Sequence, residues 1–446
     1  MRDTAPSGAG AEPGPGRAGS EWDGSGQPNP GRAGPGRAGS GWDGPPGRPR
    51  SGQPDTGWDG PGQPGPRQPT PGRDGPGRDG PRQPDTGRAE PSLETAFTRL
   101  TGVRYPIVQT GMGWVSGPRL VSATARAGAL GVLASATMTP GRLREAVREV
   151  RSRTDAPFGV NLRADASDAR ERVRILVEEG VRVASFALAP SRELIAELKD
   201  AGVVVVPSVG ARRHAEKVVA WGADAVIVQG GEGGGHTGEV ATSVLLPQVV
   251  DAVSVPVVAA GGFHDGRGLV AALAYGAAGV AMGTRFLLTS DSTVPDAVKA
   301  AYLAAGVRDV TVTRAVDGLP HRVLRTDFVA ALEGAGPAGR AAATARAVRR
   351  AAGFRRLSGL SWRRMVRDGL ALKRGKDLTW SQVLLAANTP MLLRAAMVEG
   401  RTDLGVMASG QVAGVIEDLP SCEELVRRVM SEAWRTLDSL PRPGVR

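Results

Sequence analysis

A glycine-dense segment around one histidine is the strongest chemical signal in the sequence. Six of the nine residues from Gly230 to Gly238 are glycine, and the segment also holds Glu232 and His236. Glycine at this density lets the backbone lie flat against a planar ligand, and it costs conformational entropy unless something requires it. A neutral imidazole near pH 7 is suited to removing a proton from carbon or oxygen. We therefore predict that His236 is a catalytic base, with a surface histidine in a mobile loop as the alternative.

Two further glycine-containing pairs predict a phosphate site. Gly261 and Gly262 follow the apolar run 257–260, and Gly283 and Thr284 follow the run 280–282. Glycine lets backbone N–H groups approach a ligand closely, and N–H groups at a helix start attract phosphate. Tight turns alone are the alternative explanation. Together with the loop around His236, these pairs indicate a planar cofactor with a phosphate tail, and FMN fits that description.

The remaining reactive side chains favour neither a metal nor a disulfide. Cys422 is the only cysteine, so no intrachain disulfide exists. The four histidines are far apart in the sequence, and we therefore expect no metal site. We expect His214 to be solvated on a helix, His264 to belong to a turn or to contact a phosphate, and His321 to lie in a turn-like segment.

Eight short apolar runs separated by amphipathic segments predict the elements that position these residues. The runs are 107–109, 130–133, 158–161, 183–186, 203–207, 225–229, 257–260 and 280–282. Several lack polar alternation, which is typical of parallel strands covered by helices on both faces. We predict an α/β protein with a (β/α)8 TIM barrel over 91–335, and an open doubly wound sheet is the competing architecture. The active site of such a barrel lies at the carboxyl ends of its strands.

The first 90 residues differ sharply from the rest of the chain. They contain 18 Pro and 24 Gly but no Leu, Ile, Val or Phe. Such a segment cannot bury enough apolar surface to offset the entropy of ordering it. We expect a disordered N-terminal tail over 1–90, or a mis-assigned translation start.

The C-terminal part is predicted to be helical. We expect no strands after residue 285, helices over 298–305, 341–352 and 425–437, and an extension over 336–446 that packs as a cap over the strand ends. Residues 340–376 hold twelve basic residues and one acid, which accounts for the formal net charge of +11. This stretch is either a solvated helical face or a surface for the phosphates of coenzyme A.

The composition also limits the partners and the compartment. Only Phe354 and Trp362 lie within the basic stretch, too few aromatic rings for a single-strand nucleic-acid binder, so no nucleic-acid partner is expected. No run of 18 apolar residues and no signal-peptide pattern occurs, so we expect a cytoplasmic protein without a membrane partner. Monomer and homodimer both stay open.

Five segments at predicted strand ends resemble the nitronate monooxygenase family of FMN-dependent barrels, strongly over roughly 95–330 and more loosely to the C-terminus. They are Pro106-Ile-Val-Gln-Thr-Gly-Met-Gly113, Phe158-Gly-Val-Asn-Leu162, Val228-Gln-Gly-Gly-Glu-Gly-Gly-Gly-His-Thr-Gly238, Ala259-Ala-Gly-Gly262 and Met282-Gly-Thr-Arg-Phe286. The resemblance implies that His236 is the base that removes the α-proton of a nitroalkane. It also implies FMN contacts by Met112, Gly113, Asn161, Gln229, Gly234, Gly235, Gly261, Gly262, Gly283 and Thr284.

The resemblance implies an oxidoreductase with a small-molecule substrate. Our main hypothesis is a nitronate monooxygenase that oxidises alkyl nitronates with O2. The same barrel serves flavin-dependent enoyl-thioester reductases, and a similar subgroup acts on CoA thioesters of steroid ring fragments. The alternative is therefore an FMN-dependent, NAD(P)H-linked or NAD(P)-linked dehydrogenase or reductase of an acyl-CoA.

Overall fold

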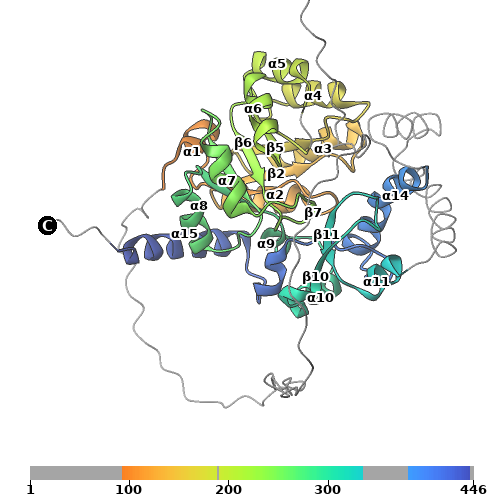
Figure 1. Cartoon of the computed structure of the whole chain (residues 1–446). Coiled ribbons are helices and arrows are strands. Elements are labelled where there is room, and N and C mark those ends of the chain that lie inside the picture. Colours follow the sequence, from red (N-terminus) through yellow and green to blue (C-terminus); the bar gives the residue numbers. More distant parts are fainter. Residues whose placement is uncertain (1–92, 188–189, 335–379, 442–446) are drawn as a thin grey trace, which may run out of the picture. The chain divides into compact units, whose positions relative to one another are not determined.

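The computed structural model describes residues 93–187, 190–334 and 380–441. In this part of the chain, eight parallel strands close into a barrel (Figure 1). Strand β1 pairs with β9, with Ile107 opposite Val280, which closes the sheet and excludes the open alternative. The strands are β1 (Ile107–Gln109), β2 (Leu130–Ala134), β3 (Phe158–Leu162), β4 (Val183–Phe186), β5 (Val204–Val209), β6 (Val226–Gln229), β8 (Val257–Ala260) and β9 (Gly279–Met282).

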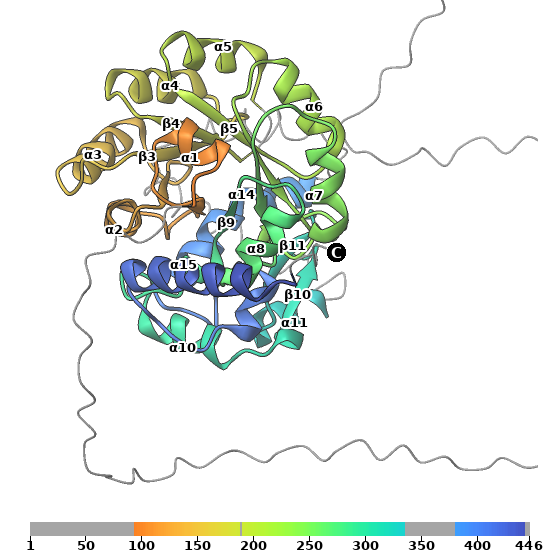
Figure 2. The same ribbon diagram turned by 90° about the vertical axis from the view of Figure 1, so that its left-hand side faces the viewer.

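Helices follow the strands and cover the outside of the barrel (Figure 2). Several begin where the sequence supplies a cap: Thr139 accepts from the Arg142 N–H at the start of α3, and Asp265 accepts from the Gly268 N–H at the start of α8. The helices are α2 (Pro118–Arg126), α3 (Pro140–Arg151), α4 (Ala169–Glu178), α5 (Arg192–Asp200), α6 (Arg212–Ala220), α7 (Thr242–Val250), α8 (Gly266–Ala274) and α9 (Thr284–Leu287).

The barrel interior is filled by small and branched side chains. Val108, Val132, Val206 and Val258 belong to one buried cluster, and Phe97 of α1 (Ala96–Thr101) joins it. Figure 2 shows α1 in front of the strands. Because every strand is buried on both faces, the sequence lacks polar alternation there.

A second, three-stranded antiparallel sheet corrects the prediction that strands stop after residue 285. Strands β10 (Val310–Thr313) and β11 (His321–Leu324) pair with each other, and β11 also pairs with β7 (Gly235–His236) from the glycine-dense loop. His321 therefore lies on a strand, and its prediction as a turn residue is wrong. Nearby are α10 (Asp296–Ala304), η1 (Val307–Asp309) and α11 (Asp327–Glu333).

The C-terminal elements comprise α14 (Trp380–Met397), η2 (Gln411–Val415) and α15 (Cys422–Ser439). Helix α15 lies beside α8 in both views, on the flank of the barrel and not over its strand ends (Figures 1 and 2). On α15, Leu425, Val429 and Ala433 are buried. The predicted tail 1–90, the helix 341–352 and the basic stretch 340–376 lie outside the described residues. Over the ranges that are described, no helix has the length and apolar character needed to span a membrane.

Candidate functional site

The loops after β1, β6, β8 and β9 converge at the carboxyl ends of the strands. A Cβ atom on Gly283, after β9, would lie 3.1 Å from Thr110 Oγ1 and 3.5 Å from Met112 Sδ, after β1. A Cβ atom on Gly261, after β8, would lie 3.0 Å from the backbone nitrogen of Gly233, after β6. Barrel closure thus gathers the predicted site residues from segments far apart in the sequence.

The β1 and β3 strand ends hold Met112, Gly113 and Asn161, all half-buried. Asn161 Nδ2 donates to the Gly111 carbonyl (3.5 Å), and Asn161 Oδ1 accepts from the Ser185 hydroxyl (3.3 Å). These contacts fix the amide at the barrel rim. A polar side chain held there is suited to hydrogen-bonding the edge of a planar ring.

Trp114 connects this rim to α14, a contact that the sequence reasoning missed. Among the non-glycine residues that the structure describes, it alone has a positive φ, 67°. Such strain in a bulky residue costs about 1–3 kcal/mol and persists only where the surroundings hold it. Its Nε1 donates to the Pro390 carbonyl (2.8 Å), and the Arg394 guanidinium carbon lies 5.5 Å from the ring centroid. Helix α14 therefore holds the residue next to Met112 and Gly113 in place.

The glycine-dense loop is anchored by hydrogen bonds and is not a free loop. Gln229 Nε2 donates to the His236 carbonyl (2.8 Å), and Arg322 donates to the Gly231 carbonyl from Nε (3.1 Å) and Nη2 (2.7 Å). Gly235, with φ of 73°, occupies the left-handed region within β7, where a side chain would be strained. The loop thus presents His236 from a sheet edge.

His236 is paired with a buried carboxylate. Its Nε2 lies 2.7 Å from Asp317 Oδ2, and the side chains are 55% and 3% exposed respectively. Burial alone would raise the pKa of Asp317, but the hydrogen bond from His236 and the nearby His321 ring outweigh it and hold that pKa below its usual range. An ionised carboxylate only accepts, so Nε2 carries the proton and Nδ1 keeps its lone pair. The exposed ring therefore offers Nδ1 as a base.

A second histidine lies against the same carboxylate. His321 is opposite His236 across β7 and β11, and the two ring centroids are 4.6 Å apart at 40°. His321 Nδ1 is 3.6 Å from Asp317 Oδ2, and both side chains are 3% exposed. Two histidines that are far apart in the sequence thus lie side by side in the structure. Neither Asp317 nor His321 was selected from the sequence, although the alternation in Val310-Thr-Val-Thr313 is a strand signal that leads to them.

Thr284 and Gly234 meet a C-terminal segment, 409–411, that the sequence reasoning also missed. The Gly410 N–H donates to Thr284 Oγ1 (2.9 Å). A Cβ atom on Gly234 would lie 2.6 Å from the Gly410 nitrogen and 2.7 Å from the Ser409 carbonyl carbon. Because the Thr284 oxygen accepts from Gly410, its hydroxyl hydrogen is directed elsewhere and can serve an anion.

Gly261 and Gly262 form the turn after β8, with φ of 95° and 86°. Both lie in the left-handed region, so the turn itself requires glycine. Beside them, Glu232 accepts from Thr242 N (2.9 Å) and Thr242 Oγ1 (2.7 Å), which caps α7. A Cβ atom on Gly262 would lie 3.7 Å from Glu232 Cβ, an ordinary contact.

The cationic groups near this corner are engaged elsewhere or biased toward neutrality. Arg285 is buried, and its Nη1 pairs with Asp418 Oδ1 (2.9 Å). His264 Nε2 is 3.6 Å from Asp265 Oδ2, and burial lowers the pKa of His264. A phosphate here would therefore depend on backbone N–H groups and on Thr284. Glycine at four strand ends leaves the backbone uncovered, so the residues present fit a flat ring with a phosphate tail.

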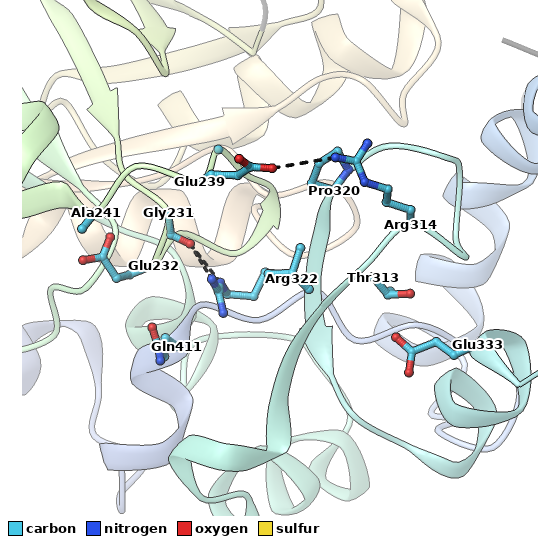
Figure 3. Close-up of a pocket in the computed structure, with 12 residues that line it drawn as sticks. Gly231, Glu232, Glu239, Ala241, Thr313, Arg314, Pro320, Arg322, Glu333 and Gln411 are labelled. Carbon is cyan, nitrogen blue, oxygen red and sulfur yellow. Dashed lines mark hydrogen bonds and ion pairs between the residues drawn. The ribbon is translucent and has the colours of Figure 1, made fainter. Parts of the chain in front are cut away.

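A cavity of about 770 Å³ opens beside the second sheet (Figure 3). Arg322 lines it, whereas the preceding residue, His321, points to the opposite face because side chains alternate along a strand. At its rim, Arg314 approaches Glu239 at 3.9 Å. His236, Asp317 and His321 are not among the residues that line this cavity. Its lining is Gly231, Glu232, Gly238, Glu239, Ala241, Val312, Thr313, Arg314, Pro320, Arg322, Glu333 and Gln411.

Comparison with known proteins supports an oxidoreductase. A Mycobacterium tuberculosis protein named (3aS,4S,5R,7aS)-5-hydroxy-7a-methyl-1-oxo-octahydro-1H-indene-4-carboxyl-CoA dehydrogenase is 65% identical over 339 residues, covering 75% of this chain and 95% of that protein. The Rhodococcus jostii protein of the same name is 62% identical over 343 residues, covering 77% and 96%. Among solved structures, FabK from Thermotoga maritima matches with a TM-score of 0.63 and 35% identity, over 78% of this chain and 98% of that one.

The family described as nitronate monooxygenase matches residues 94–174 and 166–432. These two ranges span the barrel, the second sheet and most of α15. The resemblance predicted from five strand-end segments is confirmed. The chain is thus an oxidoreductase, and it belongs to the nitronate monooxygenase family.

Proposed function

We propose that this chain is an FMN-dependent dehydrogenase that oxidises the ring hydroxyl of a bicyclic hydroxyacyl-CoA and passes the electrons to NAD(P)+. The two relatives at 65% and 62% identity are named as dehydrogenases of such a thioester. A Staphylococcus saprophyticus relative named as a probable nitronate monooxygenase is 30% identical. We therefore favour the acyl-CoA alternative over nitronate oxidation.

The observation that carries the chemistry is the 2.7 Å contact between His236 Nε2 and Asp317 Oδ2. Oxidation of a secondary alcohol to a ketone removes the hydroxyl proton and a hydride from the carbinol carbon. His236 Nδ1 takes the proton, and the buried Asp317 carboxylate stabilises the resulting imidazolium. A nitronate is already an anion and has no such proton to give, so its oxidation would not use this base.

The substrate named for the relatives has its hydroxyl on the carbon next to the one that bears the thioester. The hydroxyl is therefore β to the thioester carbonyl, and its oxidation yields a β-ketoacyl thioester. The His236 side chain is 55% exposed, so its ring is accessible to such a hydroxyl. Its proton then leaves to solvent from the same exposed ring.

FMN would supply the two-electron redox chemistry that links oxidation of the alcohol to NAD(P)+. We assign the ring side to the half-buried rim residues and the phosphate side to the glycine turns and Thr284, whose hydroxyl hydrogen is directed away from Gly410. The proposed ring-side residues are Met112, Gly113, Asn161, Gln229 and Gly235. The proposed phosphate-side residues are Gly234, Gly261, Gly262, Gly283 and Thr284.

Anaerobic flavin reduction tests the proposal. The purified protein, loaded with FMN, is mixed in separate experiments with the hydroindane hydroxyacyl-CoA, its free acid, and propionate 3-nitronate. We expect the thioester to bleach the visible flavin absorbance and NAD(P)+ to restore it. Bleaching by the nitronate without bleaching by the thioester would return the assignment to nitronate oxidation.

Asp317→Asn tests the role of the base and leaves the proposed cofactor site unchanged, because it removes the carboxylate charge without altering the size of the side chain. We expect a loss of roughly 10²–10⁴-fold in the rate of flavin reduction by the thioester, by analogy with a histidine left in the wrong tautomer. The FMN content should stay unchanged. Arg314→Gln, which changes a residue of the cavity beside the second sheet, is the matched control. Its rate of flavin reduction by the thioester should equal that of the unmodified chain.

A further inference from the structure

We propose that His321 is a positioning residue that shares the Asp317 carboxylate and thereby limits how strongly that carboxylate holds the protonated form of His236. The inference rests on the proposed role of His236 as the base. It assigns a function to a second histidine that the proposed reaction does not itself use.

The geometry places both imidazoles on one oxygen. Asp317 Oδ2 lies 2.7 Å from His236 Nε2 and 3.6 Å from His321 Nδ1, whereas Oδ1 accepts from the Leu319 N–H (3.1 Å). The Thr389 hydroxyl of α14 is 3.5 Å from the same Oδ2. A small contraction would bring His321 within hydrogen-bond distance, so it competes with His236 for that oxygen.

The burial of His321 makes a purely structural role costly. Both of its ring nitrogens are buried, and among the described residues neither has a hydrogen bond in this arrangement. A buried polar group without a partner costs about 1–3 kcal/mol, and an apolar side chain of similar size would avoid that cost. The energy is recovered if Nδ1–H donates to Asp317 during turnover.

Two ionisable groups of the described chain cluster with the His321 ring. They are Asp317, in the connection from β10, and His236, on β7. Thr313 is its cross-strand partner on β10, and Thr389 faces the carboxylate from α14. The neighbouring Arg322 is on the opposite face, bound to the Gly231 carbonyl.

The direction of the effect follows from these contacts. An N–H donor on Oδ2 neutralises part of the carboxylate charge and so weakens the attraction between Asp317 and a protonated His236. Without His321, the attraction is stronger, the base stays protonated to higher pH, and less of it is ready to accept a proton. His321 therefore leaves more of His236 in the form that can accept a proton.

The test is a histidine NMR titration of the full chain with 15N-labelled imidazoles, which needs no substrate. Four ring systems are present, and His236→Asn identifies the signal of the base. In His321→Leu, we expect the midpoint of the His236 titration to rise by about half a pH unit or more. The shift is modest because the contact with Asp317 that this variant loses is 3.6 Å long, beyond a full hydrogen bond. In His321→Asn, whose amide N–H replaces Nδ1–H, the midpoint should return to within about 0.2 units of the unmodified value.

Two controls keep the outcome decisive. His214→Leu removes an exposed histidine on α6 and should leave the His236 midpoint unchanged. In the unmodified chain, the 15N shifts should show the proton of His321 on Nδ1, so the proposal is testable even if His321→Leu does not fold. An unmoved or lowered midpoint in His321→Leu, or a bare Nδ1 on His321, would overturn it. Failure of the hydroxyacyl-CoA to reduce the flavin would leave these results unaffected and would count only against the proposed substrate.

Discussion

Gly234→Ala tests whether the C-terminal segment is part of the cofactor site. The new Cβ atom would lie 2.6 Å from the Gly410 nitrogen, 0.8 Å short of the 3.4 Å at which ordinary contact begins. Both close neighbours, Gly410 and Ser409, are backbone, so they cannot rotate away as a side chain would. Relief requires a shift of 409–410, which pulls the Gly410 N–H from Thr284 Oγ1.

The magnitude follows from overpacking and from the lost hydrogen bond. Forcing a methyl group into packed backbone costs about 1–3 kcal/mol, which lowers the melting temperature by about 2–10 °C for a domain of this size. Displacing Thr284 from its partner disturbs the proposed phosphate contact. We expect the FMN dissociation constant to rise roughly tenfold, the equivalent of about 1.4 kcal/mol.

Gly238→Ala is the matched control in the same loop, because a Cβ atom there meets nothing within 4 Å. Thermal unfolding followed by circular dichroism, together with FMN titration followed by flavin fluorescence, compares the two variants. We expect Gly238→Ala to match the unmodified chain in both measurements. Equal melting temperatures and equal FMN affinities for the two variants would refute the inferred packing of 409–410 on the loop.

Three further predictions concern the same region. Thr284→Val should weaken FMN binding measured by fluorescence titration, whereas Thr284→Ser, which keeps the hydroxyl, should bind as the unmodified chain does. Trp114→Phe removes the Nε1 donor to the Pro390 carbonyl and should lower the free energy of unfolding in urea by about 0.5–1.5 kcal/mol. An unchanged free energy of unfolding would show that this hydrogen bond does not hold the β1 loop against α14. The pKa of Asp317 is lowered in the folded chain, so the ionised carboxylate stabilises the fold above about pH 4, the ordinary range of an aspartate. That stabilisation is lost as the pH falls further. Between pH 5 and pH 3, the free energy of unfolding in urea should therefore fall less for Asp317→Asn than for the unmodified chain.

The barrel strands could be predicted because each carries its own signal. The runs 107–109, 183–186 and 257–260 coincide with β1, β4 and β8, and the other predicted runs differ from the observed strands by one or two residues at one end or, for β5, at both. Strands that are buried on both faces must be apolar throughout, and that pattern is local. The same holds for the glycines after the strands, since a turn with a positive φ restricts the residue type at that position alone.

The partners of His236 could not be predicted in the same way. Asp317 is 81 residues away in the sequence, and it reaches His236 because β11 pairs with two residues of the glycine-dense loop. Nothing in a two-residue strand such as Gly235–His236 signals its pairing. The contact of Gly410 with Thr284 spans 126 residues and depends in the same way on packing between distant segments.

The sequence by itself determined the eight barrel strands, the glycine turns that follow them and the histidine that stands among them, because each of these is set by the residue types within a short window. Tertiary structure alone decided which carboxylate orients that histidine, which second imidazole shares the carboxylate, and which backbone segment closes on Thr284. Those choices depend on how the barrel closes and how the second sheet pairs, which are properties of the whole chain and not of any one segment.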